Sequence, residues 1–209
     1  MRLLAEQIIQ CLREMDYEAT AVRDGHATGL YDYGRHARPE LKRPQCEPAW
    51  TQRLNVLLRS RGFECDAEVR YPAHDGELTR AKCDLVVEST EGKAWIEIKG
   101  AWRSYWNGKG LYLCYLFHPL MDGVDAGKSH TVPLDLKKLE AIDASHARWV
   151  CEVVVGFDTS DDAMDGDIEK LEALARFTPP KWARAHERWD DPYRVGHRVN
   201  VWAWWREVK

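Results

Sequence analysis

Residues 80–99, RAKCDLVVESTEGKAWIEIK, predict a β-hairpin. Apolar and polar side chains alternate in segments 80–88 and 94–99, which is the pattern of strands that bury one face. Between them, residues 89–92 are polar and end in glycine, as expected of a hairpin loop. The sequence therefore predicts two antiparallel strands joined by a four-residue loop.

The register of this hairpin brings charged side chains together. With a four-residue loop, Glu88 pairs with Lys93, and the same register sets Asp84 directly across from Glu97. Side chains alternate along a strand, so Glu97 and Lys99 share one face of the sheet. Two carboxylates and one ammonium group are therefore expected side by side.

The other face of the hairpin is apolar. Alternation directs Ile96 and Ile98 toward the core. Cys83, Leu85 and Val87 of the preceding strand are expected to point the same way. The charged side chains are thus expected on the face of the sheet that is opposite this core.

The opposed carboxylates predict a cation site. Like charges that face each other across strands are destabilising unless a positive charge lies between them. Magnesium prefers hard oxygen ligands and keeps several waters, so one or two carboxylates can hold it, and Mn²⁺ is expected to substitute. Lys99 would add positive charge for a phosphoryl transition state. The alternative is an exposed hairpin face on which Asp84, Glu97 and Lys99 form an ordinary ion pair.

Periodicity places further elements around the hairpin. Apolar residues at helical or strand spacing predict helices at 2–15, 48–61, 134–144 and 166–176, and strands at 63–71, 149–157 and 198–208. The first helix is interpreted as an accessory element, and residues 19–45 as a surface loop that flanks the site. The apolar run 149–157 indicates a strand buried on both faces, and the alternating tail 198–208 is interpreted as an edge strand.

Composition restricts the class of protein. A chain of 209 residues with 44% hydrophobic and 31% charged residues is typical of a globular protein, and one principal domain is expected. Charges interrupt the long apolar stretches, so neither a transmembrane helix nor a signal peptide is expected. The net charge of −4 gives no bulk attraction to nucleic acid, so any such binding must rest on local chemistry.

The six cysteines favour a reducing, cytoplasmic setting. They stand singly, without a CxxC pair or a regular spacing, so neither a zinc cluster nor a disulfide framework is indicated. Cys65 and Cys83 fall on strands that are expected to be neighbours, which leaves a two-cysteine metal site open. Structural zinc normally takes four ligands, so buried small hydrophobes are the favoured interpretation.

The pattern D…ExK at Asp84, Glu97 and Lys99 resembles the PD-(D/E)xK nuclease superfamily over roughly residues 47–157. The resemblance implies an α/β fold with a restriction-endonuclease-like core. In this core a central mixed four-stranded sheet is flanked by helices. The N-terminal helix and a C-terminal edge strand would be additions to it.

The resemblance also suggests how the single domain 1–209 is organised. Residues 47–157 would form the nuclease-like core, residues 1–46 an accessory helix and loop, and residues 158–209 a C-terminal extension. One departure from the superfamily is visible. Cys83 stands where the motif name has proline, a position that we expect to be permissive.

The site residues of the superfamily carry over one by one. Asp84 matches its first acid, Glu97 its second acid and Lys99 its lysine. Glu47 matches the acid that the first helix often contributes. These four residues form the expected catalytic set, and the expected metal ligands are Asp84, Glu97 and Ile98.

The assignment of Glu47 has alternatives. An acid in a first helical turn also complements the helix dipole, which is a purely structural role. Glu64 and Glu68, on the strand expected at 63–71, compete for the fourth acidic position.

Basic and aromatic residues near the motif are candidates for contacts to nucleic acid. The expected DNA-binding residues are Arg38, Lys42, Arg43, Lys128 and Lys138. Asp135 either helps to orient the site or is a plain residue of a helix start. Trp102 and Trp106 could line the cleft, because aromatic faces stack on bases. His118 and His130 are secondary candidates.

The sequence thus predicts a magnesium-dependent endonuclease that acts on DNA, double-stranded DNA included. No membrane association is expected, and a homodimer is left open. Two other functions also stay open: a catalytically silent nucleic-acid-binding or assembly module of the same fold, and a hydrolase of another phosphoester. The intact Asp84, Glu97 and Lys99 argue against the silent module.

Overall fold

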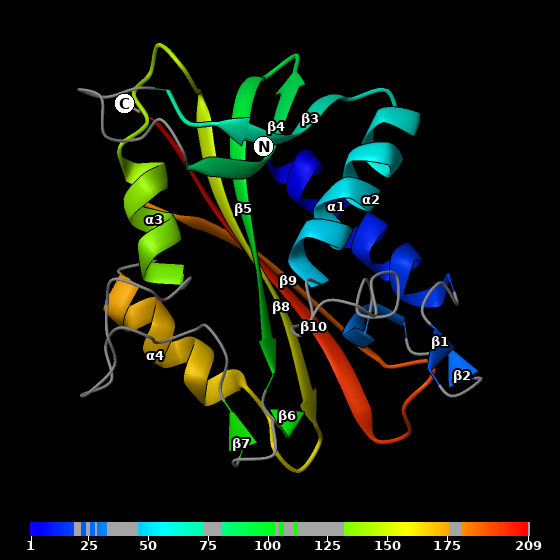
Figure 1. The fold of residues 1–209 in the computed structure, drawn as a ribbon. Coiled ribbons are helices and arrows are strands. Elements are labelled where there is room, and N and C mark those ends of the chain that lie inside the picture. Colours follow the sequence, from blue (N-terminus) through cyan, green and yellow to red (C-terminus); the bar gives the residue numbers. More distant parts are fainter. Residues whose placement is uncertain are drawn as a thin grey trace.

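The computed structural model describes residues 1–18, 22–23, 26–27, 29–32, 46–72, 81–102, 105–106, 111–112, 132–175 and 181–208. A mixed six-stranded sheet separates two layers of helices (Figure 1). One face is covered by α1 (Arg2–Tyr17) and α2 (Cys46–Ser60). The other is covered by α3 (Val132–Glu140) and α4 (Asp165–Ala175). The expected α/β class is confirmed at this level.

The strand order of the sheet is β3-β4-β5-β8-β10-β9. The strands are β3 (Glu64–Arg70), β4 (Lys82–Ser89), β5 (Gly92–Trp102), β8 (Trp149–Thr159), β9 (Ala183–Asp190) and β10 (His197–Glu207). β5 and β8 run parallel, and the other neighbours are antiparallel. The short elements are β1 (Val22–Arg23), β2 (His26–Ala27), η1 (Gly29–Asp32), β6 (Tyr105–Trp106) and β7 (Leu111–Tyr112).

The central hairpin forms in the expected register. β4 and β5 are antiparallel, and Glu88 lies opposite Lys93. Ser89 also pairs with Gly92, so the loop is shorter than the four residues expected. The register is unchanged because the loop shortens equally at both ends.

Two expectations about the sheet are wrong. The sheet has six strands, whereas a four-stranded core with one added C-terminal edge strand was expected. The tail strand β10 is not an edge strand, because it lies between β8 and β9. The edge strand beyond β10 is β9, which was not predicted from the sequence. An edge strand with mostly exposed side chains needs no apolar alternation, and the sequence ARAHERWD has none.

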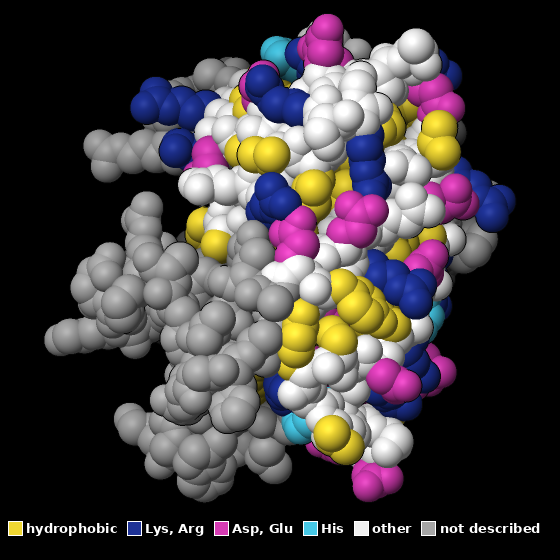
Figure 2. Space-filling model, turned by 90° about the vertical axis from the view of Figure 1, so that its right-hand side faces the viewer, with side chains coloured by type: hydrophobic (Ala, Val, Ile, Leu, Met, Phe, Trp, Pro, Cys, Tyr) yellow, Lys and Arg dark blue, Asp and Glu magenta, His cyan; other side chains and the backbone are white. Residues whose placement is uncertain are grey.

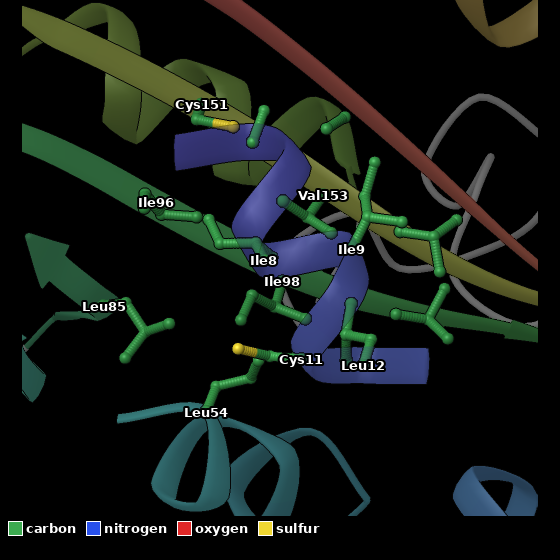
Figure 3. Packing of buried hydrophobic residues seen from close by; sticks show 14 of the residues in the cluster. Ile8, Ile9, Cys11, Leu12, Leu54, Leu85, Ile96, Ile98, Cys151 and Val153 are labelled. Carbon is green, nitrogen blue, oxygen red and sulfur yellow. The ribbon is translucent and has the colours of Figure 1, made fainter. Parts of the chain in front are cut away.

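The apolar core lies between the sheet and the α1/α2 layer. Ile8 and Ile9 of α1 point at the sheet, where Ile96, Ile98 and Val153 meet them (Figure 3). All five side chains are buried. The helix interpreted as accessory therefore supplies a large part of the main core. Ile96 and Ile98 lie on the apolar face, as alternation predicts.

A second cluster of buried side chains lies between the sheet and the α3/α4 layer. Trp202 of β10 packs there with Val154 of β8 and with Met164, just before α4. Gly156 makes room for the indole, because a Cβ at this position would lie 2.5 Å from a ring carbon of Trp202. Residues 150–158 of β8 are all buried, which confirms the expectation of a strand buried on both faces.

Cys83 corrects another expectation. It was expected on the apolar face with Leu85 and Val87, but it belongs to the cluster on the α3 side, next to Tyr71. At this point β4 pairs with β3, and Val69, which lies opposite Cys83, packs against the same α3-side cluster. The backbone of β3 departs from regular extended geometry at Glu68, where φ is 57°, so strict alternation is interrupted here. Cys65 lies in the other cluster, and both thiols are free and buried, as small hydrophobes would be.

The outer surface of the α1/α2 layer is not a basic patch. Figure 2 shows Lys and Arg side chains interspersed with Asp and Glu on this side. The arginines of α2 and of the turn after it are paired with acids: Arg53 with Glu18, Arg59 with Asp66 and Arg61 with Glu14. Among the described residues, no helix is both long and apolar enough to cross a membrane.

Candidate functional site

Six ionisable side chains gather on the α3 side of the sheet. We call them the charged cluster: Asp84 of β4, Glu97 and Lys99 of β5, Asp135 and Lys138 of α3, and Glu152 of β8. They meet because α3 packs against β5 and β8, and because β5 and β8 are direct neighbours. The motif residues of the hairpin are therefore joined by three residues from outside it.

Asp84 and Glu97 are in contact, as the register predicts. The Asp84 carboxyl group is close enough to that of Glu97 to lower the Glu97 pKa by hydrogen bonding. Asp84 Oδ2 also accepts a hydrogen bond of 2.7 Å from the backbone N–H of Ile98. The last residue pair of β4 and β5 is Leu85 with Ile96. Just beyond this pair, the Asp84 carboxylate takes the place of a backbone carbonyl as the acceptor for the Ile98 N–H.

Two crossed ion pairs connect β5 with α3. Lys99 Nζ lies 3.0 Å from Asp135 Oδ2, and Lys138 Nζ lies 3.1 Å from Glu97 Oε1. Lys138 Nζ also donates to Asp135 Oδ1 over 2.5 Å. Each ammonium group therefore contacts an acid of the other element, so the hairpin and the helix are held together by charge.

Tyr71, directly after β3, completes the surroundings of Glu97. Its hydroxyl donates to Glu97 Oε1, the oxygen that also accepts from Lys138. Its ring stacks on Trp95 with a centroid separation of 5.4 Å. Burial, the nearby Cys83 and Glu97 raise the pKa of Tyr71, so the phenol stays a proton donor. No pattern in the sequence marks this residue.

Glu152 is another residue of this site that was not predicted from the sequence. It lies opposite Glu97 in the parallel pair of β5 and β8, and it is fully buried. Among the residues that the structure describes, neither of its carboxylate oxygens has a hydrogen-bond partner. Burial, followed by Asp135 and Glu97, raises its pKa, while Lys99 and Lys138 oppose that shift. A single charged residue within an otherwise apolar run was the signal that could have revealed it.

The cluster contains more acids than bases. Burial and the charge of Asp135 raise the pKa of Glu97, although Lys138 and the hydrogen bonds from Tyr71 and Asp84 act against the rise. Four carboxyl groups face only two ammonium groups. With all six groups ionised the cluster would carry a net charge of about −2, which one divalent cation could neutralise.

The cluster reaches solvent through two of its members. Glu97 is 3% exposed and Lys99 5%, and Asp135 and Glu152 are also buried. Asp84 is partly exposed, and the side chain of Lys138 is 27% exposed. A ligand that approaches from solvent would therefore meet Asp84 and Lys138 first.

The donor set fits a magnesium ion better than a softer metal. Among the described residues, no three His, Cys, Asp or Glu side chains surround a common metal position. Magnesium does not need three, because one or two carboxylates with waters and substrate oxygens suffice. The side chain of Ile98 lies in the apolar core, so only its carbonyl oxygen could serve as a ligand. In an extended strand this oxygen points toward the same neighbouring strand as the Ile98 N–H, which faces Asp84.

Several candidate residues are not placed in the cluster. Glu47 lies in the first turn of α2, but its side chain is not among those that the structure describes, and the same holds for the side chains of Trp102 and Trp106. Six further candidates lie outside the described residues altogether: Arg38, Lys42, Arg43, His118, Lys128 and His130. Glu64 pairs with Glu88, away from the cluster, and Glu68 forms an ion pair with Lys82. Lys138, which the sequence predicts as a DNA-binding residue, contacts Glu97 and Asp135.

Three comparisons with known proteins found no relative of this chain. No family model matches the chain, and neither a curated protein nor a solved structure matches it.

Proposed function

We propose that this chain is a divalent-metal-dependent nuclease of the PD-(D/E)xK type that hydrolyses DNA phosphodiester bonds at the charged cluster. One observation carries the proposal. The carboxyl groups of Asp84 and Glu97 touch where the β4–β5 pairing ends, and Lys99 lies on the same face of β5. The placement of two carboxylates beside one lysine, with the Ile98 carbonyl alongside, supports a site for Mg²⁺ or Mn²⁺.

Each of these side chains has a definable task. Asp84 and Glu97, with the Ile98 carbonyl, would hold the cation. When bound, the cation supplies Lewis-acid charge to the phosphoryl oxygens. Lys99 would add positive charge where the oxyanionic transition state develops and help to position the attacking water. Hydrolysis adds this water to phosphorus and breaks one P–O bond.

The surroundings of Lys99 favour a role in catalysis over a role in binding. Its ammonium group is held by Asp135 at 3.0 Å and its side chain is 6% exposed. A buried, fixed charge contributes little to the first encounter with DNA but acts strongly on charge that develops beside it. We therefore expect Lys99→Met to lower kcat by roughly 10²-fold or more with DNA affinity nearly unchanged.

The decisive experiment incubates the purified protein with plasmid, linear and single-stranded DNA and with RNA, in Mg²⁺, Mn²⁺ or EDTA. Cleavage of DNA is expected with either metal and not with EDTA. Asp84→Asn should abolish cleavage, and Lys99→Met should slow it by roughly 10²-fold or more. The matched control is Lys93→Met, because Lys93 forms an exposed ion pair with Glu88 in the same hairpin. Full activity of Lys99→Met would remove Lys99 from the site.

A second candidate is a catalytically silent nucleic-acid-binding or assembly module. The observation that favours it is the crossing of the ion pairs, because Lys99 and Lys138 are both engaged by acids of the cluster. Such a module would bind DNA without cleaving it in any metal. A hydrolase of another phosphoester would instead turn over a small diester such as bis(p-nitrophenyl) phosphate while leaving DNA intact.

A further inference from the structure

Lys138 occupies the place of a cation within the charged cluster. Its ammonium nitrogen lies between two carboxylates, 3.1 Å from Glu97 Oε1 and 2.5 Å from Asp135 Oδ1. It also lies 6.0 Å from the centroid of the Tyr71 ring, which is within the range of a cation–π contact. Glu97 is one of the two acids assigned to the metal, so the ammonium and the metal would use the same carboxylate.

We propose that Lys138 is a built-in competitor of the divalent cation, which holds Glu97 and Asp135 until the metal displaces it. The inference rests on the proposed function, since it takes Glu97 as a metal ligand. An ammonium group and a divalent cation on one buried carboxylate repel each other strongly, because little water screens them. The two occupants therefore exclude each other.

Lys138 can leave, and Lys99 is held in place. The side chain of Lys138 is 27% exposed, so it can extend into solvent on its flexible four-carbon stem. The side chain of Lys99 is 6% exposed, and its partner Asp135 is buried. A cation that binds Glu97 thus has one lysine to expel and one that stays beside the phosphate. Once released, Lys138 lies at the solvent-facing side of the cluster, where it can contact a phosphate of DNA.

In the absence of metal, Lys138 supplies a counter-charge to Glu97 and Asp135. Buried carboxylates that lose their only counter-charges are strongly destabilising. Glu152, buried and without a hydrogen-bond partner among the described residues, adds further negative charge beside Glu97. A mobile internal cation stabilises this arrangement until a metal arrives. In the open arrangement, Lys138 has left Glu97; in the paired arrangement, it is bound to Glu97. Only the open arrangement can bind metal, so the apparent affinity for metal is lowered by the fraction of molecules that are open.

The test is calorimetric titration of Mg²⁺ and of Mn²⁺ into the full chain and three variants. Lys138→Met removes the competitor, and Lys138→Arg keeps a cation at the same position. Lys137→Met is the matched control, because Lys137 is the exposed neighbour in the same helix. If the paired arrangement outweighs the open one about tenfold, Lys138→Met lowers the Kd for metal by about tenfold. Lys138→Arg and Lys137→Met should stay close to the wild type.

Thermal unfolding supplies a readout that does not depend on activity. In EDTA, Lys138→Met should melt below Lys137→Met, since Glu97 and Asp135 lose a counter-charge. Saturating Mg²⁺ should narrow or close this gap. Should Lys138→Met prove too unstable in EDTA, Lys138→Gln, titrated after confirmation of its circular dichroism spectrum, takes its place with the same expected gain in affinity.

Equal Kd values for the wild type and Lys138→Met, weaker binding by that variant, or no metal binding by either protein would overturn the inference. Failure of the nuclease proposal looks different. In that case Lys138→Met gains affinity for metal, which supports the competition, while the wild-type protein leaves every nucleic acid intact.

Discussion

The two faces of the central sheet bury their side chains by different means. On the α1/α2 face, Ile8, Ile96 and Ile98 pack within a cluster of buried hydrophobic side chains. On the α3 face, Glu97 and Lys99 of the same strand are almost as well buried, but among charges. Neighbouring residues of β5 thus point to opposite faces with opposite chemistry. An apolar face stabilises through area removed from water, whereas a buried charged face depends on every counter-charge being in place.

This contrast has a consequence for function. A packed apolar layer tolerates little change in volume but needs no external ligand. A cluster with four carboxyl groups and two lysines is best balanced when a cation joins it. The α1/α2 face therefore acts as the rigid support, and the α3 face is the one whose state can change on binding.

Glu97→Gln should have the largest effect on cleavage, because it removes one of the carboxylates that would hold the cation on the α3 face. We expect DNA cleavage to fall by roughly 10³-fold or more. The metal-free protein should remain folded, since the change relieves desolvation of the buried carboxylate and its repulsion from Asp135. Single-turnover cleavage assays and thermal melts in EDTA measure the two effects. Glu88→Gln in the same hairpin is the control, and equal activity of the two variants would exclude Glu97 from the site.

Ile8→Ala tests the apolar face. Ile8 is fully buried against the sheet, so its truncation leaves a cavity and should cost about 2 to 5 kcal/mol in the free energy of unfolding. Leu3 of the same helix is 61% exposed, and Leu3→Ala should cost less than about 0.5 kcal/mol. Urea denaturation measures both. Similar losses for the two variants would show that α1 does not pack as described.

Asp16 is the polar exception near the apolar face. It accepts hydrogen bonds from Leu30 N at 2.8 Å and from Trp189 Nε1 at 2.7 Å. Burial outweighs these bonds and raises its pKa to about 6. The native state therefore binds a proton that the unfolded chain releases near pH 4, so this carboxyl favours folding below about pH 4 and loses that contribution as the pH rises to about 6.

The expected loss from Asp16 is about 2 to 3 kcal/mol across that range. Asp16→Asn cannot titrate, so its unfolding free energy should change less between pH 4 and pH 6.5 than that of the wild type. Denaturation at a series of pH values measures the difference. Parallel profiles for the two proteins would contradict the raised pKa.

Glu152→Gln should have the smallest effect and should act on the α3 face. Burial, Asp135 and Glu97 raise the pKa of Glu152, so the native state holds its proton more tightly than the unfolded chain. Its contribution to stability is present below about pH 4.3 and is lost as the pH rises through the folded pKa. The variant should therefore be more stable than the wild type in EDTA at alkaline pH. A clear loss of stability there would indicate that the carboxylate has a stabilising partner.

The hairpin shows how far local pattern reaches. The faces of Ile96 and Glu97 and the pairing of Glu88 with Lys93 could be predicted, because a strand alternates with a period of two and a short loop limits the register. The same reasoning was wrong for Cys83, which lies two residues beyond the last pair of β4 with β5, Leu85 and Ile96. There the carboxylate of Asp84 accepts a hydrogen bond from the backbone N–H of Ile98.

The outer strands show where local pattern fails. The alternating tail was correctly predicted as a strand, but its place in the sheet depends on β9, whose exposed side chains carry no apolar pattern. Strand order is a property of pairings between distant segments. A single stretch of sequence does not contain that information.

The sequence by itself determined the helices and strands of the core, the two faces of β5, and the neighbourhood of Asp84, Glu97 and Lys99. These follow from periodicity and from short loops, which act over a few residues. Only the tertiary structure decided that Asp135 and Lys138 cross-pair with this motif and that Glu152 is buried beside it. Those residues lie 36 or more positions beyond Lys99, and they meet it because α3 and β8 pack on β5.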